Sequence, residues 1–143
     1  WLVGGHSAGG HLAATLAATD WAARGLAGLR FAGVLPSSGV FELPPLLATS
    51  LNVALQLDLA EATQLSALYL APPKGVRVIA AVGGAESAEF LRQTHGFARR
   101  WTQQGAAVAA LELPGRNHFT VQDAWAEPDG ALFAAAWGLL HAG

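Results

Sequence analysis

One serine lies between glycines at a spacing that suits nucleophilic chemistry. The stretch Gly5-His6-Ser7-Ala8-Gly9 has the pattern G-x-S-x-G. An apolar run precedes it and an alanine-rich stretch follows it, so we expect a strand, a tight turn and a helix. In such a turn the serine adopts a strained backbone conformation, and side chains at Gly5 and Gly9 would clash. The pattern predicts that Ser7 is a nucleophile held at the end of a strand.

The residue after this serine is expected to serve the same reaction through its backbone. Ala8 would begin the helix, where backbone N–H groups have no partner within the helix. Such a group faces the point where negative charge develops during acyl transfer. We therefore predict that the Ala8 N–H group forms part of an oxyanion hole.

A serine hydroxyl is a poor nucleophile at neutral pH and needs a base within hydrogen-bond reach. The sequence offers five histidines, which are His6, His11, His95, His118 and His141. We interpret the first two as supporting the serine turn, while His95 falls within a predicted helix and His141 near the end of the chain. His118 follows the last predicted strand in a polar loop, so we predict that it is the base.

The base needs an acid to orient it, and in this chain order the acid lies between serine and histidine. Glu86 falls just past the end of the strand predicted over residues 76–82, which makes it the first candidate. Glu89 is the alternative, although a carboxylate in the first turn of a helix is also favoured by the helix dipole alone.

Strands and helices must alternate along the chain to position these side chains. Apolar runs predict strands at residues 2–4, 31–35, 76–82 and 108–113, and helical spacing predicts helices at residues 7–19, 88–104 and 130–140. This alternation predicts an α/β fold with a parallel sheet and helices on both faces. The cluster Pro-Ser-Ser-Gly at residues 36–39 reads as a turn, and the aromatic residues of the last helix, Phe133 and Trp137, read as core.

Residues 40–70 differ in composition from the rest of the chain, with two prolines followed by leucine, alanine and amide side chains. We predict short helices and loops here, in an insertion that covers the pocket of a single partial domain spanning residues 1–143. No domain boundary is evident.

Composition excludes several classes of function. The 143 residues are 52% hydrophobic and 13% charged, with a net charge of −2 and no cysteine. Basic residues are scattered and no apolar run approaches the ~20 residues of a membrane span, so neither nucleic acid nor membrane is expected as a partner. No metal-ligand spacing or nucleotide-binding loop is present, so we expect no metal and no cofactor. We expect a small-molecule substrate and a cytoplasmic location, and we leave open a homodimer.

Four ordered blocks, at residues 5–12, 38–46, 82–90 and 113–119, resemble the kynurenine formamidase (arylformamidase) branch of the α/β-hydrolases. The resemblance implies the C-terminal portion of that fold and a metal-free Ser-Asp-His triad. It also implies hydrolysis of N-formyl-L-kynurenine to L-kynurenine and formate. Carried over, Ser7 is the nucleophile, His118 the base and Glu86 the acid, with glutamate in place of the aspartate of the branch.

The chain begins at Trp1 inside a predicted strand and contains no methionine, so we expect it to be part of a longer protein. The resemblance implies that an H-G-G segment before residue 1 supplies the second oxyanion donor, and the piece alone would then be weak or inactive. Two alternatives to an arylformamidase remain. One is a general carboxylesterase or lipase-like hydrolase, and the other is a non-catalytic binding protein with the same fold.

Overall fold

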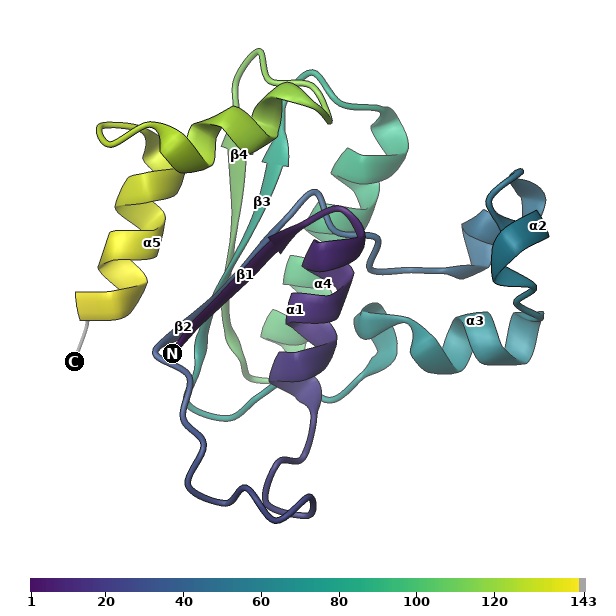
Figure 1. Ribbon diagram of the computed structural model, residues 1–143, viewed down its shortest axis with the longest axis horizontal. Coiled ribbons are helices and arrows are strands. Elements are labelled where there is room, and N and C mark those ends of the chain that lie inside the picture. The colour runs from purple at the N-terminus through teal and green to yellow at the C-terminus, as the bar shows by residue number, and fades with distance from the viewer. Residues whose placement is uncertain (142–143) are drawn as a thin grey trace.

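Four parallel strands form the centre of the structure, a computed structural model that describes residues 1–141 (Figure 1). They are β1 (Leu2–His6), β2 (Gly33–Ser37), β3 (Arg77–Gly83) and β4 (Ala107–Leu113), in that spatial order. The registers pair His6 with Ser37, Ser37 with Ala81, and Gly83 with Leu113. All four strands therefore end at the same edge of the sheet, where the loops that follow them meet.

Helices cover both faces of this sheet (Figure 1). α1 (Ala8–Ala18) and α4 (Ala88–Gln103) pack on one face, while α5 (Ala131–His141) and the 3-10 helix η3 (Thr120–Ala126) pack on the other. The predicted α/β architecture is thus confirmed, and most element boundaries lie within two residues of those predicted. The inner strands β2 and β3 are mostly buried because helices cover both of their faces, whereas the edge strand β4 is largely exposed.

Each face has its own core. On the side of α1 and α4, Phe41, Phe97 and Trp101 are fully buried and pack in succession. The first two rings stack with centroids 4.1 Å apart, and the last two are tilted with centroids 4.3 Å apart. α1 contributes alanines, whose small side chains let that helix approach the sheet closely. On the other face Leu35 of β2 meets apolar residues of η3 and α5. The two cores hold the strand ends at fixed positions.

Residues 40–70 contain short helices, as predicted. These are η1 (Pro44–Ala48), α2 (Asn52–Leu55), α3 (Leu59–Leu65) and η2 (Ala67–Tyr69). Asp58 and Glu61 form a capping box at the start of α3, which satisfies backbone N–H groups that the helix leaves free. α2 and α3 extend away from the sheet in Figure 1.

Two expectations were wrong. Phe133 and Trp137 were predicted in the core, but they are 39% and 56% exposed, whereas Leu132 and Leu139 of the same helix are buried. Because α5 is apolar on every side, its helical period could not show which face meets the sheet. The second apolar run also does not end at Leu35, because β2 continues through Pro36 to Ser37.

Among residues 1–141, no helix combines the length and apolar character that crossing a bilayer requires.

Candidate active site

Ser7 lies at the junction of β1 and α1 in a conformation that L-residues rarely adopt. Its φ and ψ angles are 57° and −116°. Its N–H group donates to the carbonyl of Ser37 at the end of β2, at 2.9 Å, and its carbonyl accepts from the N–H group of His11. Such strain persists only where the surroundings hold it. Here a neighbouring strand and the first turn of α1 fix the serine at the sheet edge.

The two glycines of this turn are not equivalent. A Cβ atom at Gly5 would lie 2.4 Å from the carbonyl oxygen of Gly9. Because that oxygen belongs to the backbone, it cannot move aside as a flexible side chain could. A Cβ atom at Gly9 would meet nothing within 4 Å in the described part of the chain. The predicted clash is therefore confirmed at Gly5, and the prediction is wrong for Gly9. The first turn of α1 lies over Gly5, whereas Gly9 in that turn faces open space.

The loops after β1, β3 and β4 bring three predicted side chains together. The Ser7 hydroxyl oxygen is 3.1 Å from Nε2 of His118, and Nδ1 of His118 is 2.7 Å from Oε2 of Glu86. Because a carboxylate only accepts hydrogen bonds, its contact implies that Nδ1 of His118 carries a proton. In the neutral ring Nε2 is then the acceptor, and it faces the serine hydroxyl.

The Glu86 side chain is completely buried, while that of His118 is 25% exposed. The second carboxylate oxygen, Oε1, accepts from the N–H group of Gly83 at 2.8 Å and from the Ser38 hydroxyl at 2.5 Å. A buried carboxylate without such donors would be costly. Both of its oxygens are therefore engaged, one by the fixed scaffold and one by the imidazole.

Two further rings enclose the imidazole of His118. Phe90 of α4 stacks on it with centroids 4.2 Å apart, and the ring of His6 lies 4.6 Å away on a tilted plane. Burial lowers the pKa of His6, as does the neighbouring His118. His6 is therefore neutral near pH 7 and adds no positive charge beside His118. Its uncharged ring forms one wall beside the imidazole of His118.

The other three histidines have contacts elsewhere. Nδ1 of His11 lies 3.0 Å from the carbonyl of Val40, and burial lowers the pKa of this ring. His95 pairs with Glu112 on the surface at 2.6 Å. His141 contacts the carbonyl of Trp137 at 2.9 Å. His11 thus links α1 to the chain after β2, which fits the supporting part expected of it.

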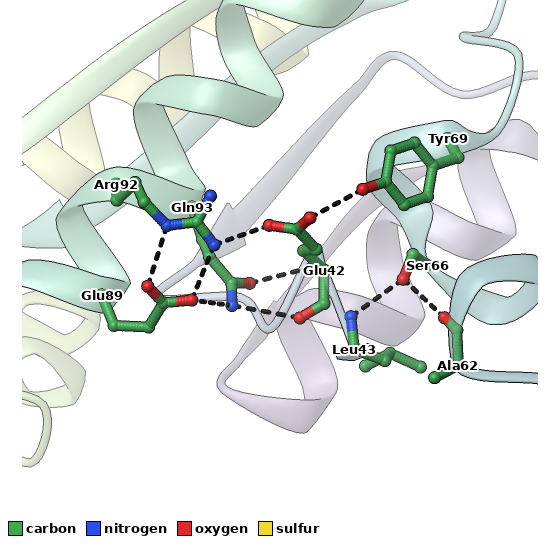
Figure 2. A network of polar contacts seen from close by, with 8 residues as sticks. All are labelled: Glu42, Leu43, Ala62, Ser66, Tyr69, Glu89, Arg92 and Gln93. Carbon is green, nitrogen blue, oxygen red and sulfur yellow. Dashed lines mark hydrogen bonds and ion pairs between the residues drawn. The ribbon is translucent and has the colours of Figure 1, made fainter. Parts of the chain in front are cut away.

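Glu89 belongs to a different network, shown in Figure 2. Its carboxylate accepts from Arg92 at 2.7 and 2.8 Å and from the Gln93 amide at 2.8 Å. Arg92 also donates to Glu42 at 2.6 Å, and the Tyr69 hydroxyl donates to the other oxygen of that carboxylate at 2.6 Å. Glu89 therefore takes part in joining α4 to the segment after β2. Of the two candidate acids, Glu86 is the one that contacts His118.

The same view shows how residues 40–70 attach to the body of the molecule (Figure 2). The Gln93 side chain bonds both backbone groups of Glu42, at 2.9 and 3.1 Å. The buried Ser66 hydroxyl accepts from the Leu43 N–H group at 2.8 Å and donates to the Ala62 carbonyl at 2.6 Å. Both ends of the segment are thus anchored by named contacts, while α2 and α3 between them are largely exposed.

Ala8 is the first residue of α1 and is exposed. Its N–H group is among those that an α-helix leaves without an intrahelical acceptor, beside the Ser7 hydroxyl. Within residues 1–141, no group of three or more histidine and carboxylate side chains is arranged to hold a metal ion.

Three neighbours of this site were missed from the sequence. Ser38 was read as part of a turn, although polar residues directly after a predicted strand are the signal that could have pointed to it. His6 was interpreted only as supporting the serine turn, yet its ring also contacts the ring of His118. Phe90 carries no sequence signal, since an aromatic residue in an amphipathic helix is usually core.

Solved structures share this architecture. A protein of Silicibacter sp. TM1040 classed as a candidate thioesterase superposes with a TM-score of 0.79 at 31% identity, covering 94% of this chain and 49% of its own. A Pyrobaculum calidifontis esterase superposes with a TM-score of 0.68 at 16% identity, covering 96% of this chain and 51% of its own. The fold is that of an α/β-hydrolase.

Sequence comparison narrows the relationship. The kynurenine formamidase of Salmo salar is 29% identical over 123 residues, and that of Danio rerio is 29% identical over 122 residues. Each alignment covers 82% of this chain and 42% or 41% of the relative, so the chain spans less than half the length of these relatives. No protein-family model matches the sequence. The sequence is thus similar to those of kynurenine formamidases over most of its length.

Proposed function

We propose that this protein is a serine hydrolase in which Ser7, His118 and Glu86 act as nucleophile, base and orienting acid. One observation carries the proposal, which is the continuous hydrogen-bonded line from the serine hydroxyl through the imidazole to a fully buried carboxylate. Distances of 3.1 and 2.7 Å lie within the range for proton transfer and for orientation of the ring. Relationship to named hydrolases supports the same reaction class.

The reaction begins when Nε2 of His118 takes the hydroxyl proton as Ser7 Oγ bonds to the substrate carbonyl carbon. The carbonyl oxygen becomes negatively charged, and the Ala8 N–H group donates to it. The bond to the leaving group then breaks, and His118 returns the proton to the departing nitrogen or oxygen. Water, activated by the same imidazole, releases the acyl group and restores Ser7.

The substrate we propose is N-formyl-L-kynurenine, which would yield L-kynurenine and formate. The supporting observation is the likeness to two kynurenine formamidases. A formyl group is the smallest acyl group, so its attack by Ser7 needs little room beyond the oxyanion donor. Residues 40–70, anchored beside α4, would cover the aromatic leaving group.

A general carboxylesterase is the second candidate, because esterases share this fold along 96% of the chain. The decisive assay measures hydrolysis of N-formyl-L-kynurenine beside p-nitrophenyl acetate. Turnover of the formamide supports the first proposal. Turnover of the ester alone supports the second.

Ser7→Ala tests whether either activity uses this site. We expect a loss of at least ~10³-fold in kcat, together with loss of labelling by an organophosphate in intact-protein mass spectrometry. Ser50→Ala, at an exposed serine between η1 and α2, is the matched control and should retain both. Full activity in Ser7→Ala would contradict the proposal, because turnover would then not depend on the Ser7 hydroxyl.

A further inference from the structure

We propose that Ser38 is a positioning residue of this site, which holds one oxygen of Glu86 so that the other faces His118. The inference rests on the proposed function, because it assigns a part in that reaction to a residue that touches neither substrate nor nucleophile. Ser38 would act only through Glu86.

The contact between the two side chains is short and shielded from water. The Ser38 hydroxyl donates to Oε1 of Glu86 at 2.5 Å, and both side chains are fully buried. The N–H group of Gly83 donates to the same oxygen at 2.8 Å. Hydrogen bonds to an ionised acceptor are stronger than neutral ones, and low dielectric strengthens them further. Two donors on Oε1 leave Oε2 for the imidazole.

The backbone at Ser38 is held in a conformation that would not arise without constraint. Its φ angle is +48°, in the left-handed region that favours glycine. Its N–H group donates to the carbonyl of Ala81 at 2.7 Å, which extends the contact between β2 and β3 by one residue. This turn aims the hydroxyl across the end of β3 at the carboxylate. Glycine would adopt this φ angle with less strain than serine does. The presence of serine here therefore points to a requirement for its hydroxyl.

Glutamate at the acid position makes such a donor useful. Compared with aspartate, it has one more rotatable bond, so its carboxylate has more orientations to choose from. A hydroxyl on one side and a backbone N–H group on the other restrict that choice. We infer that Ser38 compensates for the extra methylene group.

The chain contains its own control next to this residue. Ser37 is also fully buried, but its hydroxyl oxygen has no hydrogen-bond partner among residues 1–141. Ser37→Ala and Ser38→Ala therefore remove the same atom from neighbouring buried positions, and only the second removes a donor to Glu86. Ser38→Gly is an additional variant that removes the hydroxyl and suits the positive φ angle.

The kinetic test uses hydrolysis of p-nitrophenyl acetate. We expect Ser38→Ala and Ser38→Gly to lower kcat by about 10- to 100-fold with KM unchanged, since a hydrogen bond to a charged group is lost. Ser37→Ala should stay near the wild-type value. In a Glu86→Ala background, Ser38→Ala should cost nothing further, because no carboxylate remains to be held. An equal loss in both backgrounds would indicate a purely structural role and overturn the proposal.

A second readout does not depend on turnover, so failure of the proposed function and failure of this inference can be told apart. In proton NMR of the folded protein, the Nδ1 proton of His118 should give a downfield signal from its bond to Glu86. Ser38→Ala should shift or broaden that signal, and Ser37→Ala should leave it in place. An unchanged signal in Ser38→Ala would overturn the positioning role even if the protein is an active hydrolase. A changed signal would support the role even if p-nitrophenyl acetate is not cleaved.

Discussion

Glu86 and Glu89 lie three residues apart, on either side of the residue that caps α4, yet their surroundings are opposite. The Glu86 side chain is 0% exposed, and its carboxylate accepts hydrogen bonds from a hydroxyl, a backbone N–H group and an imidazole. The Glu89 side chain is 45% exposed and pairs with Arg92. Neutral donors alone hold one carboxylate, whereas the other is held by a long cationic side chain and an amide.

The difference shows what each arrangement can do. Buried donors leave Glu86 in one orientation and with its charge directed at an imidazole, which suits catalysis. In the network of Glu42, Glu89 and Arg92, one partly exposed guanidinium is shared by two carboxylates, which suits attachment of a surface segment. The following substitutions test whether these two carboxylates really differ in this way.

The largest difference is expected in turnover. Glu86→Gln keeps the shape of the side chain but replaces the acceptor facing Nδ1 of His118, so kcat should fall by about 10⁴-fold. Glu89→Gln should change kcat by less than about threefold, because an exposed ion pair contributes little. The measurement is steady-state hydrolysis of the substrate that the protein cleaves. A comparable loss in both variants would remove the distinction between the two sites.

The next effect concerns stability at the buried site. A Cβ atom at Gly83 would lie 2.2 Å from the carbonyl oxygen of Arg116 and 3.1 Å from Oε1 of Glu86. Gly83→Ala should therefore destabilise the fold by roughly 1–3 kcal/mol, measured by urea unfolding. Gly84→Ala is the control, since its Cβ atom would have ordinary contacts at 3.5 Å and should cost less than about 0.5 kcal/mol. Equal stability in the two variants would contradict the tight packing described around Glu86.

A smaller effect is expected at the exposed network. Arg92→Ala removes the cation shared by Glu42 and Glu89, and we expect a cost below about 1 kcal/mol that shrinks further in high salt. Hydrogen exchange should show where the loss falls. Backbone N–H groups of α3 and η2 should exchange faster, while those of β3 keep their wild-type rates. Faster exchange in β3 would mean that the network supports the core as well as the segment.

The smallest effect is a pH dependence of the same attachment. The Tyr69 hydroxyl, and with it Arg92, lowers the pKa of Glu42 below its ordinary value of 4.5. A carboxyl group whose pKa is lower in the folded state stabilises that state above its unfolded pKa and loses the contribution as pH falls through the folded pKa. Acidification below about pH 4.5 should therefore lower the free energy of unfolding by less than about 1 kcal/mol through this group. Glu42→Gln should remove that part of the pH dependence, and an identical profile in both proteins would contradict the assignment.

Much of this protein could be read from local pattern. The G-x-S-x-G turn and the alternation of strand and helix follow from steric and periodic rules that act over a few residues, and the order of serine, acid and histidine is the one known for triads of this fold. These rules place Ser7, Glu86 and His118 after three different strands, and parallel strands end at one edge. The proximity of the three side chains could be expected for that reason, although they are separated by up to 111 residues.

Only the tertiary structure decided which contacts complete the site and which face of each element is buried. Glu86 and Glu89 are both glutamates near the start of one helix, and no local rule says that one meets an imidazole and the other an arginine. The same holds for Ser38 beside Ser37, and for Trp137 beside Leu139 on an apolar helix. Such choices depend on distant segments, because a side chain's burial and its donors are set by whatever the fold packs against it.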